Sequence, residues 1–215
     1  MKNLRLLAGS ALVALGLASA ASAEVTAVTS YNYMSIDMAG TDFDASGLTL
    51  DLDGDYAGGF QWDATLGYAH EDSFSIGAHG ATVGAAWHYN DVVGPAARYA
   101  YIDLGPIDGD VFMVGLSGEY AMNDVTFEGE LVSDVDNFGD TNLLSLGVDF
   151  DYSDRMVLTA DVDHLAADGV DDTTLVNFGV EYDVTNTAYV KAGVTAGEVG
   201  GFDAKGVNLG VGFNF

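Results

Sequence analysis

Hydrophobic and polar positions alternate along nearly the whole chain after residue 23. Apolar side chains occupy every second position of residues 60–68, with polar or small residues between them. Residues 144–152, 174–182 and 207–215 repeat this pattern. A period of two is typical of strands that have one apolar face. Because no window carries an apolar stripe of helical period, the pattern predicts an all-β fold.

Twelve segments carry the alternation. We predict strands over 25–35, 46–53, 59–69, 74–89, 93–102, 111–121, 124–133, 142–152, 156–164, 173–183, 187–196 and 205–215. Tight polar turns follow the even-numbered segments, at Asn90-Asp91, Asn123-Asp124, Ser153-Asp154 and Thr185-Asn186, where short polar side chains suit the backbone. Moderately longer loops rich in Gly and Asp follow the odd-numbered segments, at Leu104–Asp110, Asp134–Thr141 and Gly197–Lys205.

An aromatic residue stands close to most of the tight turns. Tyr56, Tyr89, Tyr120, Tyr152, Tyr182 and Phe213 share one parity of the alternation and recur once per predicted hairpin. Turn-flanking tyrosines of a soluble β-protein are the alternative interpretation. A second aromatic set lies at the opposite strand ends, namely Tyr31, Tyr33, Tyr68, Phe74, Tyr99, Tyr101 and Phe112. Two aromatic girdles around an apolar band are typical of outer-membrane barrels.

The strand count favours an apolar face that points outward. A barrel of about eight strands can fill its interior with side chains, whereas a wider barrel leaves a lumen. If twelve strands close one antiparallel β-barrel, apolar side chains pointing inward would line a void. The apolar face must then contact lipid, and closure satisfies the backbone groups there. The fold class predicted is a closed antiparallel transmembrane β-barrel with short periplasmic turns and moderately longer extracellular loops.

Residues 1–23 have the pattern of a secretory signal peptide. Lys2 and Arg5 precede the apolar run from Leu6 to Ala20, and Ala21-Ser22-Ala23 fits a cleavage site. An N-terminal membrane helix is the alternative, but the run is short and ends in small residues. The barrel domain is therefore expected over 24–215, and no apolar stretch in it is long enough for a transmembrane helix.

Acidic residues dominate the charge. The chain has 33 acidic and 6 basic residues, a formal net charge of -27, and 49% hydrophobic residues. Such a surface repels phosphate, so nucleic acid is excluded as a partner. The absence of cysteine excludes disulfides, thiolate metal sites and cysteine nucleophiles. No cofactor is indicated.

The polar parity of the strands collects most of the charged residues. On that face we place the candidate pore-lining residues Asp51, Asp63, Arg98, Glu119, Glu128, Glu130, Asp149, Asp151, Asp161, Asp163, Glu181 and Lys191, and with them Asp53 and Asp183. Acidic rings in a pore favour cations. The sequence thus suggests a passive, cation-preferring diffusion channel. Alternatively, the acids only hydrate a lumen that does not conduct. Arg98 and Lys191 either compensate charge or narrow the lumen.

The C-terminal segment 206–215 alternates apolar residues and ends in Phe215. Together with the girdles, the turns and the signal sequence, this segment makes the chain resemble bacterial outer-membrane porins of the acidic, glycine-rich alphaproteobacterial kind. The resemblance implies the outer membrane of a Gram-negative bacterium, with outer-membrane lipid and the barrel-assembly machinery as partners. It further implies Phe213 and Phe215 as the assembly signal, and small cationic or neutral hydrophilic solutes. General porins are larger and fold a long third loop into the pore, so the oligomeric state stays open.

The sequence offers weaker support for two other function classes. Catalysis would need a histidine beside a nucleophile, and His70 lies near Ser73 and Ser75 in sequence, but no catalytic motif accompanies them. We therefore predict that the protein is not an enzyme. A non-transporting structural barrel of eight or ten strands is the alternative to the channel.

Asp51-Leu-Asp53-Gly-Asp55 resembles the start of a calcium loop but lacks its later ligands, so no metal site is predicted.

Overall fold

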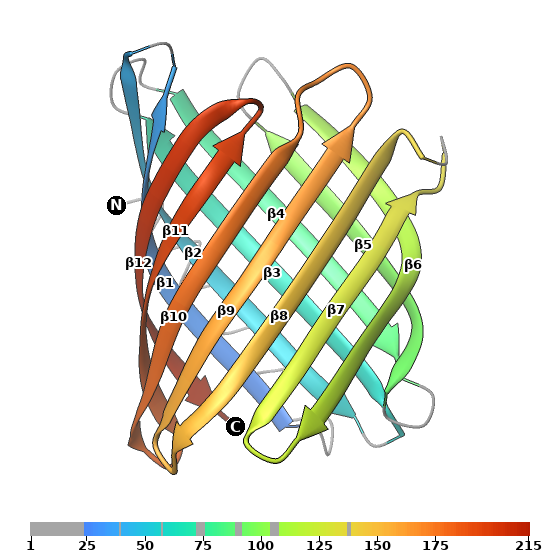
Figure 1. The fold of residues 1–215 in the computed structure, drawn as a ribbon, viewed down its shortest axis with the longest axis vertical. Helices are drawn as coiled ribbons and strands as arrows, with labels where there is room; N and C mark the ends of the chain where they lie inside the picture. Colours follow the sequence, from blue (N-terminus) through green and yellow to red (C-terminus); the bar gives the residue numbers. More distant parts are fainter. Residues whose placement is uncertain are drawn as a thin grey trace.

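The computed structural model describes residues 24–38, 40–56, 58–71, 76–88, 92–103, 108–136 and 139–215. They form twelve antiparallel strands that close into one barrel (Figure 1). The strands are β1 Glu24–Asp37, β2 Asp42–Tyr56, β3 Phe60–Glu71, β4 Ile76–Trp87, β5 Val93–Asp103, β6 Asp108–Met122, β7 Val125–Asp134, β8 Thr141–Ser153, β9 Met156–Ala167, β10 Thr173–Thr185, β11 Ala188–Val199 and β12 Phe202–Asn214.

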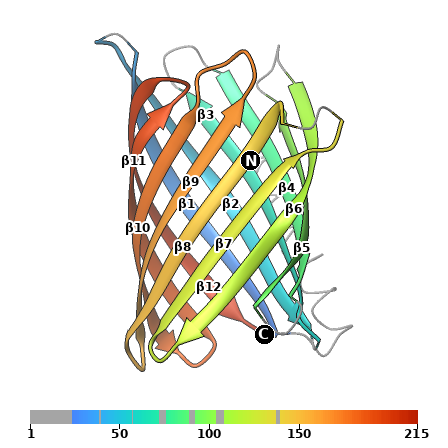
Figure 2. The ribbon, with the colours of Figure 1, turned by 45° about the vertical axis from the view of Figure 1, so that its right-hand side comes forward.

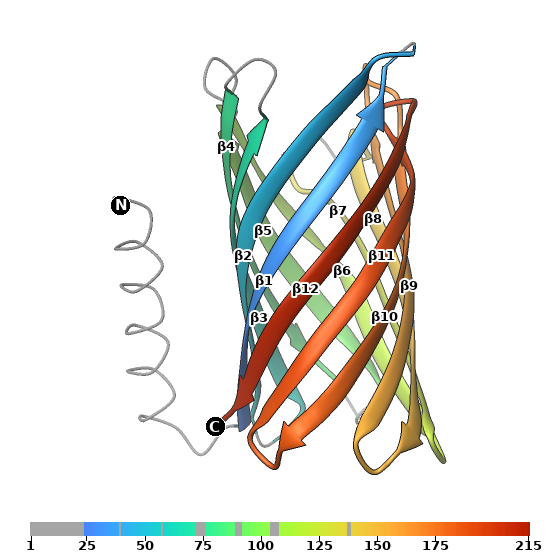
Figure 3. The same cartoon turned by 90° about the vertical axis from the view of Figure 1, so that its left-hand side faces the viewer.

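The first and last strands join to close the sheet. β1 pairs with β12 from Thr26 opposite Asn214 to Asp37 opposite Asp203, and it also pairs with β2 along its full length. Figures 2 and 3 show the strands tilted steeply around the barrel, with β1 and β12 side by side. We call the end where β1 begins and β12 ends the terminus end, and the opposite end the far end. Because each strand has two neighbours, the sheet has no free edge.

The predicted twelve-strand count is confirmed, and the alternative of eight or ten strands is wrong. Every expected segment forms a strand that is hydrogen-bonded on both sides. Several expectations lie outside the described residues: the signal sequence 1–23, the girdle residues Phe74 and Tyr89, and the turn Asn90-Asp91. Most of Leu104–Asp110 lies outside them as well.

One expected loop is wrong. Within Gly197–Lys205, strand pairing continues to Val199 opposite Phe202, and only Gly200 and Gly201 connect the two strands. Both glycines have positive φ angles, +57° and +78°. A two-residue turn with both φ values positive matches the twist of a hairpin and favours glycine. The glycine-rich composition therefore indicated a tight hairpin rather than a longer loop.

The outer face of the barrel is apolar. Large exposed side chains alternate along the strands, including Leu66, Val83, Leu116, Leu131, Leu146, Phe178, Val194 and Leu209. Tyr120, Tyr152, Tyr182 and Phe213 are exposed near the terminus end, and Tyr33, Tyr99, Tyr101 and Phe112 are exposed nearer the far end. An apolar band between aromatic girdles is the surface expected against lipid. Among the described residues, no helix is long and apolar enough to cross a membrane.

The opposite parity faces the interior and is mainly polar or small. One apolar cluster interrupts it, formed by Ala96, Met113 and Val132 with Ala86, Val111 and Leu143 packed against them. Val132 is only 1% exposed. This cluster lies on the inner face of β4 to β8, so one stretch of the inner wall is closely packed.

A charged residue on the outer face should destabilise the barrel far more than one on the inner face. Leu209 is exposed on the outer face at the middle of β12, and its neighbour Asn208 faces inward. We expect Leu209→Arg to lower the free energy of unfolding in vesicles by about 2–4 kcal/mol, the cost of arginine near a bilayer midplane. The measurement is equilibrium denaturant unfolding of the reconstituted protein.

Asn208→Arg serves as the matched control, because it adds the same charge to the adjacent position on the other face. We expect only a small loss of stability for this variant. Equal losses for the two variants would contradict the assignment of the faces.

Candidate functional site

The strand register places all twelve predicted charged residues on the inner face. Adjacent strands carry them at facing positions: Asp53 lies opposite Asp63, Glu119 opposite Glu128, and Glu181 opposite Lys191. The same register chain reaches Asp51, Arg98, Glu130, Asp149, Asp151, Asp161 and Asp163. The alternation in the sequence therefore sorted these side chains onto one face, but it did not indicate which of them would interact.

Arg98 joins two acids from strands on either side of its own. Its Nη1 donates to Asp63 Oδ2 at 3.0 Å, and its Nε donates to Glu130 Oε1 at 2.7 Å. Asp63 lies on β3 and Glu130 on β7, while Arg98 lies on β5. Side chains can cross the intervening strands in this way only on the concave inner side of the barrel. We call Asp63, Arg98 and Glu130 the arginine bridge.

The neighbouring strands leave room for the arginine bridge. Gly84 on β4 lies between Asp63 and Arg98 in the register, and a side chain there would collide with the Asp63 carboxylate. On the other side, Arg98 lies directly opposite Met113 of the apolar cluster. Two paired carboxylates around a guanidinium hold it in one position, because both forks of its hydrogen-bond donors are used.

A second contact crosses the interior closer to the terminus end. Gln61 on β3 donates from Nε2 to Glu119 Oε2 on β6 at 3.1 Å. Glu119 stands opposite Glu128 on the neighbouring strand, and like charges at facing positions repel. The amide of Gln61 offers a neutral donor that partly offsets this repulsion.

Glu128 lies at the centre of a group of carboxylates. It interacts electrostatically with Asp149, Glu119, Asp53 and Asp161, which come from β8, β6, β2 and β9. Asp53 comes from β2, which is not a neighbour of β7 in the sheet, so the acids that act on Glu128 are not confined to adjacent strands. We call these five residues the carboxylate group.

Lys191 on β11 supplies positive charge to the same region. Its Nζ is 4.0 Å from Glu181 Oε1, and it interacts electrostatically with Asp53, Asp149 and Asp161. A single lysine ammonium cannot pair closely with all of these acids. Acidic side chains therefore outnumber Lys191 in this part of the described interior.

The wall formed by β8 to β11 carries a polar ladder. Ser145 donates to Asp163 at 2.7 Å, and Asn177 donates to Asp161 at 2.6 Å and to Asp163 at 3.4 Å. Thr195 in turn donates to the Asn177 side-chain oxygen at 2.6 Å. Asp161 and Asp163 are thus held in place by neutral donors of the same wall.

Sequence reasoning missed three interior features. The apolar cluster was visible as Val111, Met113, Val132 and Leu143 in the inward parity. The many acids of the same parity nevertheless favoured the prediction of a polar interior. His88, which is buried, lies with Nε2 2.7 Å from Ser117 Oγ, whereas the sequence had singled out His70. Tyr189 is buried inside, where a side chain at Gly212 would meet its ring. Neither of the last two contacts has a signal in the linear sequence.

The described residues include no group of three or more histidine, aspartate or glutamate side chains arranged to hold a metal ion. Ser73 and Ser75, which sequence proximity had linked to His70, lie outside the described residues.

The terminal aromatics lie at the barrel seam. Phe213 is exposed on the outer face, and the backbone N–H of Phe215 donates to the Val25 carbonyl at 2.9 Å.

Comparison with known proteins identifies the fold. No protein-family model and no curated protein sequence matches this chain. The chain has the barrel fold of outer-membrane porins. It is similar to the NanC porin, with a TM-score of 0.63 and 11% identity over 87% of this chain and 100% of that one. It is also similar to the KdgM porin, with a TM-score of 0.59 and 14% identity over 87% and 99%.

A barrel of another kind is similar as well. The translocator domain of the autotransporter NalP from Neisseria meningitidis matches with a TM-score of 0.53 and 17% identity, over 100% of this chain and 95% of that one. At these identities the likeness concerns the fold alone. Function must therefore be argued from the interior of this chain.

Removing the guanidinium should destabilise the barrel by exposing the two acids of the arginine bridge to each other. Arg98 has 20% of its side chain exposed, and both carboxylates lose their close partner in Arg98→Met. We expect a loss of about 2 kcal/mol, below the 3–5 kcal/mol found for fully buried pairs because water reaches this site. Denaturant unfolding in vesicles measures it.

The triple variant Arg98→Met, Asp63→Asn, Glu130→Gln is the control, because it removes the repulsion together with the arginine. It should regain most of the lost stability. If the triple variant is as unstable as Arg98→Met alone, the arginine bridge does not act through charge.

Proposed function

We propose that this protein is a passive diffusion channel of a Gram-negative outer membrane that prefers cations and small hydrophilic solutes. The observation that carries the proposal is the carboxylate group, in which acids from β2 and β6 to β9 act on one another with Lys191 as the nearby base. Fixed carboxylates inside a pore attract cations and repel anions. Low-dielectric walls focus that field and raise the local counter-ion concentration.

The exposed apolar band supports the membrane location, because such a surface is stable only against lipid. Export through the predicted signal sequence, insertion by the barrel-assembly machinery through Phe213 and Phe215, and an alphaproteobacterial origin belong to the same proposal. These parts rest on the sequence alone.

The solute preference that we propose differs in charge from the ligand named for one structural neighbour. KdgM has been solved in complex with oligogalacturonate, a chain of acidic sugars. In the described interior of the present chain, carboxylates far outnumber Arg98 and Lys191, and Arg98 is already bound on both sides. A polyanion would meet repulsion rather than recognition, so we propose cationic or neutral solutes.

A non-transporting barrel is the second candidate, since two contacts support it. The arginine bridge and the contact between Gln61 and Glu119 both reach across several strands and narrow the interior along one wall. Swelling of liposomes in small neutral sugars separates the two candidates, because only an open channel admits the solute.

Neutralising the carboxylate group should weaken cation preference. We expect the double variant Glu128→Gln, Asp149→Asn to lower the cation-to-anion permeability ratio by about twofold or more, because it removes two charges that act together on passing ions. The measurement is the reversal potential of the reconstituted protein in a planar bilayer under a potassium chloride gradient.

Asp154→Asn is the matched control, because this acid lies in the turn between β8 and β9 and outside the carboxylate group. It should leave the reversal potential nearly unchanged. Anion preference in the unmodified protein, or the absence of any conductance, would sink the proposed function.

A further inference from the structure

An apolar groove crosses the outer face over β3 to β8. Ala85 and Ala97, which face each other on β4 and β5, form its floor together with Val114. The next outward pair toward the far end is Val83 opposite Tyr99, both exposed. Two alanines thus stand where the surrounding surface carries large side chains. We call this feature the alanine groove.

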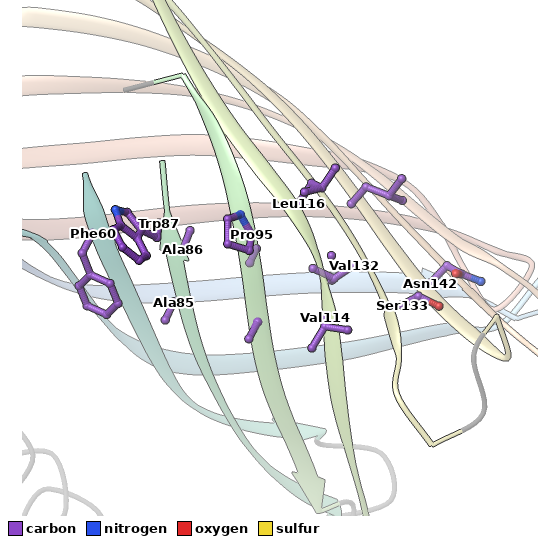
Figure 4. A pocket seen from close by; sticks show the side chains of 14 residues that line it. Phe60, Ala85, Ala86, Trp87, Pro95, Val114, Leu116, Val132, Ser133 and Asn142 are labelled. Atoms are coloured by element: carbon purple, nitrogen blue, oxygen red, sulfur yellow. The ribbon is translucent and has the colours of Figure 1, made fainter. Parts of the chain in front are cut away.

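Large side chains form the walls of the alanine groove. The wall on the side of the terminus end is formed by Phe60, Trp87, Pro95, Leu116 and Leu131. The exposed side chains of Val83, Tyr99 and Phe112 stand on the opposite side of the floor. Figure 4 shows Phe60, Trp87, Pro95 and Leu116 along the groove. Trp87 and Leu116 are each 59% exposed, so they stand well above the alanine floor. The volume of the groove is about 720 Å³. This value lies within the roughly 300–1,000 Å³ of small-molecule sites.

The two ends of the alanine groove differ in polarity. Figure 4 shows Phe60 and Trp87 at one end and Ser133 and Asn142 at the other. Asn142 donates to the Gly139 carbonyl at 2.7 Å, and Ser133 accepts from the Gly139 N–H at 3.1 Å. Both lie where β7 ends and β8 begins, at the far end of the barrel. An occupant must therefore be apolar along its length and can be polar at one end.

We propose that the alanine groove binds one acyl chain of a membrane lipid lengthwise, with the headgroup near Ser133 and Asn142. The groove is continuous with the apolar band that faces lipid. Between apolar surfaces in a membrane, association depends on close packing rather than on exclusion of water. A flexible acyl chain fills a concave groove with many dispersion contacts. This inference rests on the membrane location in the proposed function.

A second copy of this chain fits the groove less well. Within the described outer surface, the protruding Leu116 stands on one side of the floor and the exposed Val83 and Tyr99 stand on the other, so two such faces would meet at their ridges and leave both grooves empty. A lipid chain needs no complementary ridge. It is also the solvent of this surface, present at high local concentration.

Trp87 provides a direct probe of the occupant. The chain has only two tryptophans, and Trp62 Nε1 is buried with no hydrogen-bond partner in the described residues, so Trp62→Phe breaks no such bond. In that background, vesicles containing phosphatidylcholine with brominated acyl chains should quench Trp87 at low mole fraction. The reference is a tryptophan placed by Val207→Trp on β12, an exposed position of the band, with both natural tryptophans changed to Phe.

We expect half-maximal quenching of Trp87 at a mole fraction of brominated lipid about threefold lower than that needed for the tryptophan at position 207, because the groove holds its lipid by packing. Ala97→Leu fills the floor of the groove. It should raise the mole fraction for half-maximal quenching of Trp87 to the one found for position 207. Equal values at the two positions, or no effect of Ala97→Leu, would overturn the proposal.

Two further outcomes are distinguishable. If neither tryptophan is quenched, the barrel does not sit in the bilayer, and the membrane location fails together with this inference. If Leu116→Cys forms a disulfide between two copies at high lipid-to-protein ratio, a second copy occupies the face and the lipid proposal fails alone. The chain has no natural cysteine to confuse that readout.

Discussion

The pairing of β1 with β12 is the constraint on which the rest of the structure depends. Lipid offers no hydrogen bonds to a backbone, so a strand at the edge of an open sheet would leave a row of donors and acceptors unsatisfied. Closure removes that edge by joining Thr26–Asp37 to Asp203–Asn214. Once the sheet is closed, each side chain faces either the surroundings or the interior, and a shift of one residue would exchange the two sets.

Closure also concentrates charge. Acidic residues that share one parity are spread along the sequence, yet the closed barrel brings Asp53 close enough to Glu128 for the two carboxyl groups to interact electrostatically. The arginine bridge, Gln61 and the polar ladder hold several of these acids in place. Glycines such as Gly84 leave the space that these crossing side chains require. Structure and electrostatics of the interior are thus consequences of one closed register.

Most of the fold could be predicted from the sequence, because alternation has a local cause. A two-residue period fixed the number of strands and the face of every charged candidate. The hairpin at Gly200 and Gly201 was predicted as a loop, because glycine occurs both in loops and in tight turns, and only φ distinguishes them. The start of β2 at Asp42 was placed too late, although Phe43 and Ala45 alternate with polar residues over 42–46.

The arrangement within the site could not be predicted in the same way. Arg98 reaches Asp63 and Glu130 over intervening strands, and His88 reaches Ser117 across β5. Such contacts depend on barrel curvature and on the reach of each side chain, and the alternation of apolar and polar positions specifies neither. The apolar cluster around Val132 was visible in the inward parity, but its burial results from packing between five strands.

The most direct test of the account compares two adjacent residues of β8 as single cysteines in the reconstituted barrel. Gly147 faces inward beside Glu128, with room for a side chain, and Leu146 faces outward. We predict that water-soluble thiol reagents modify Gly147→Cys, and that a cationic reagent reacts faster than an anionic one of the same size. Leu146→Cys should not react. Modification of Leu146→Cys at the same rate, or no reaction at Gly147→Cys, would contradict the account.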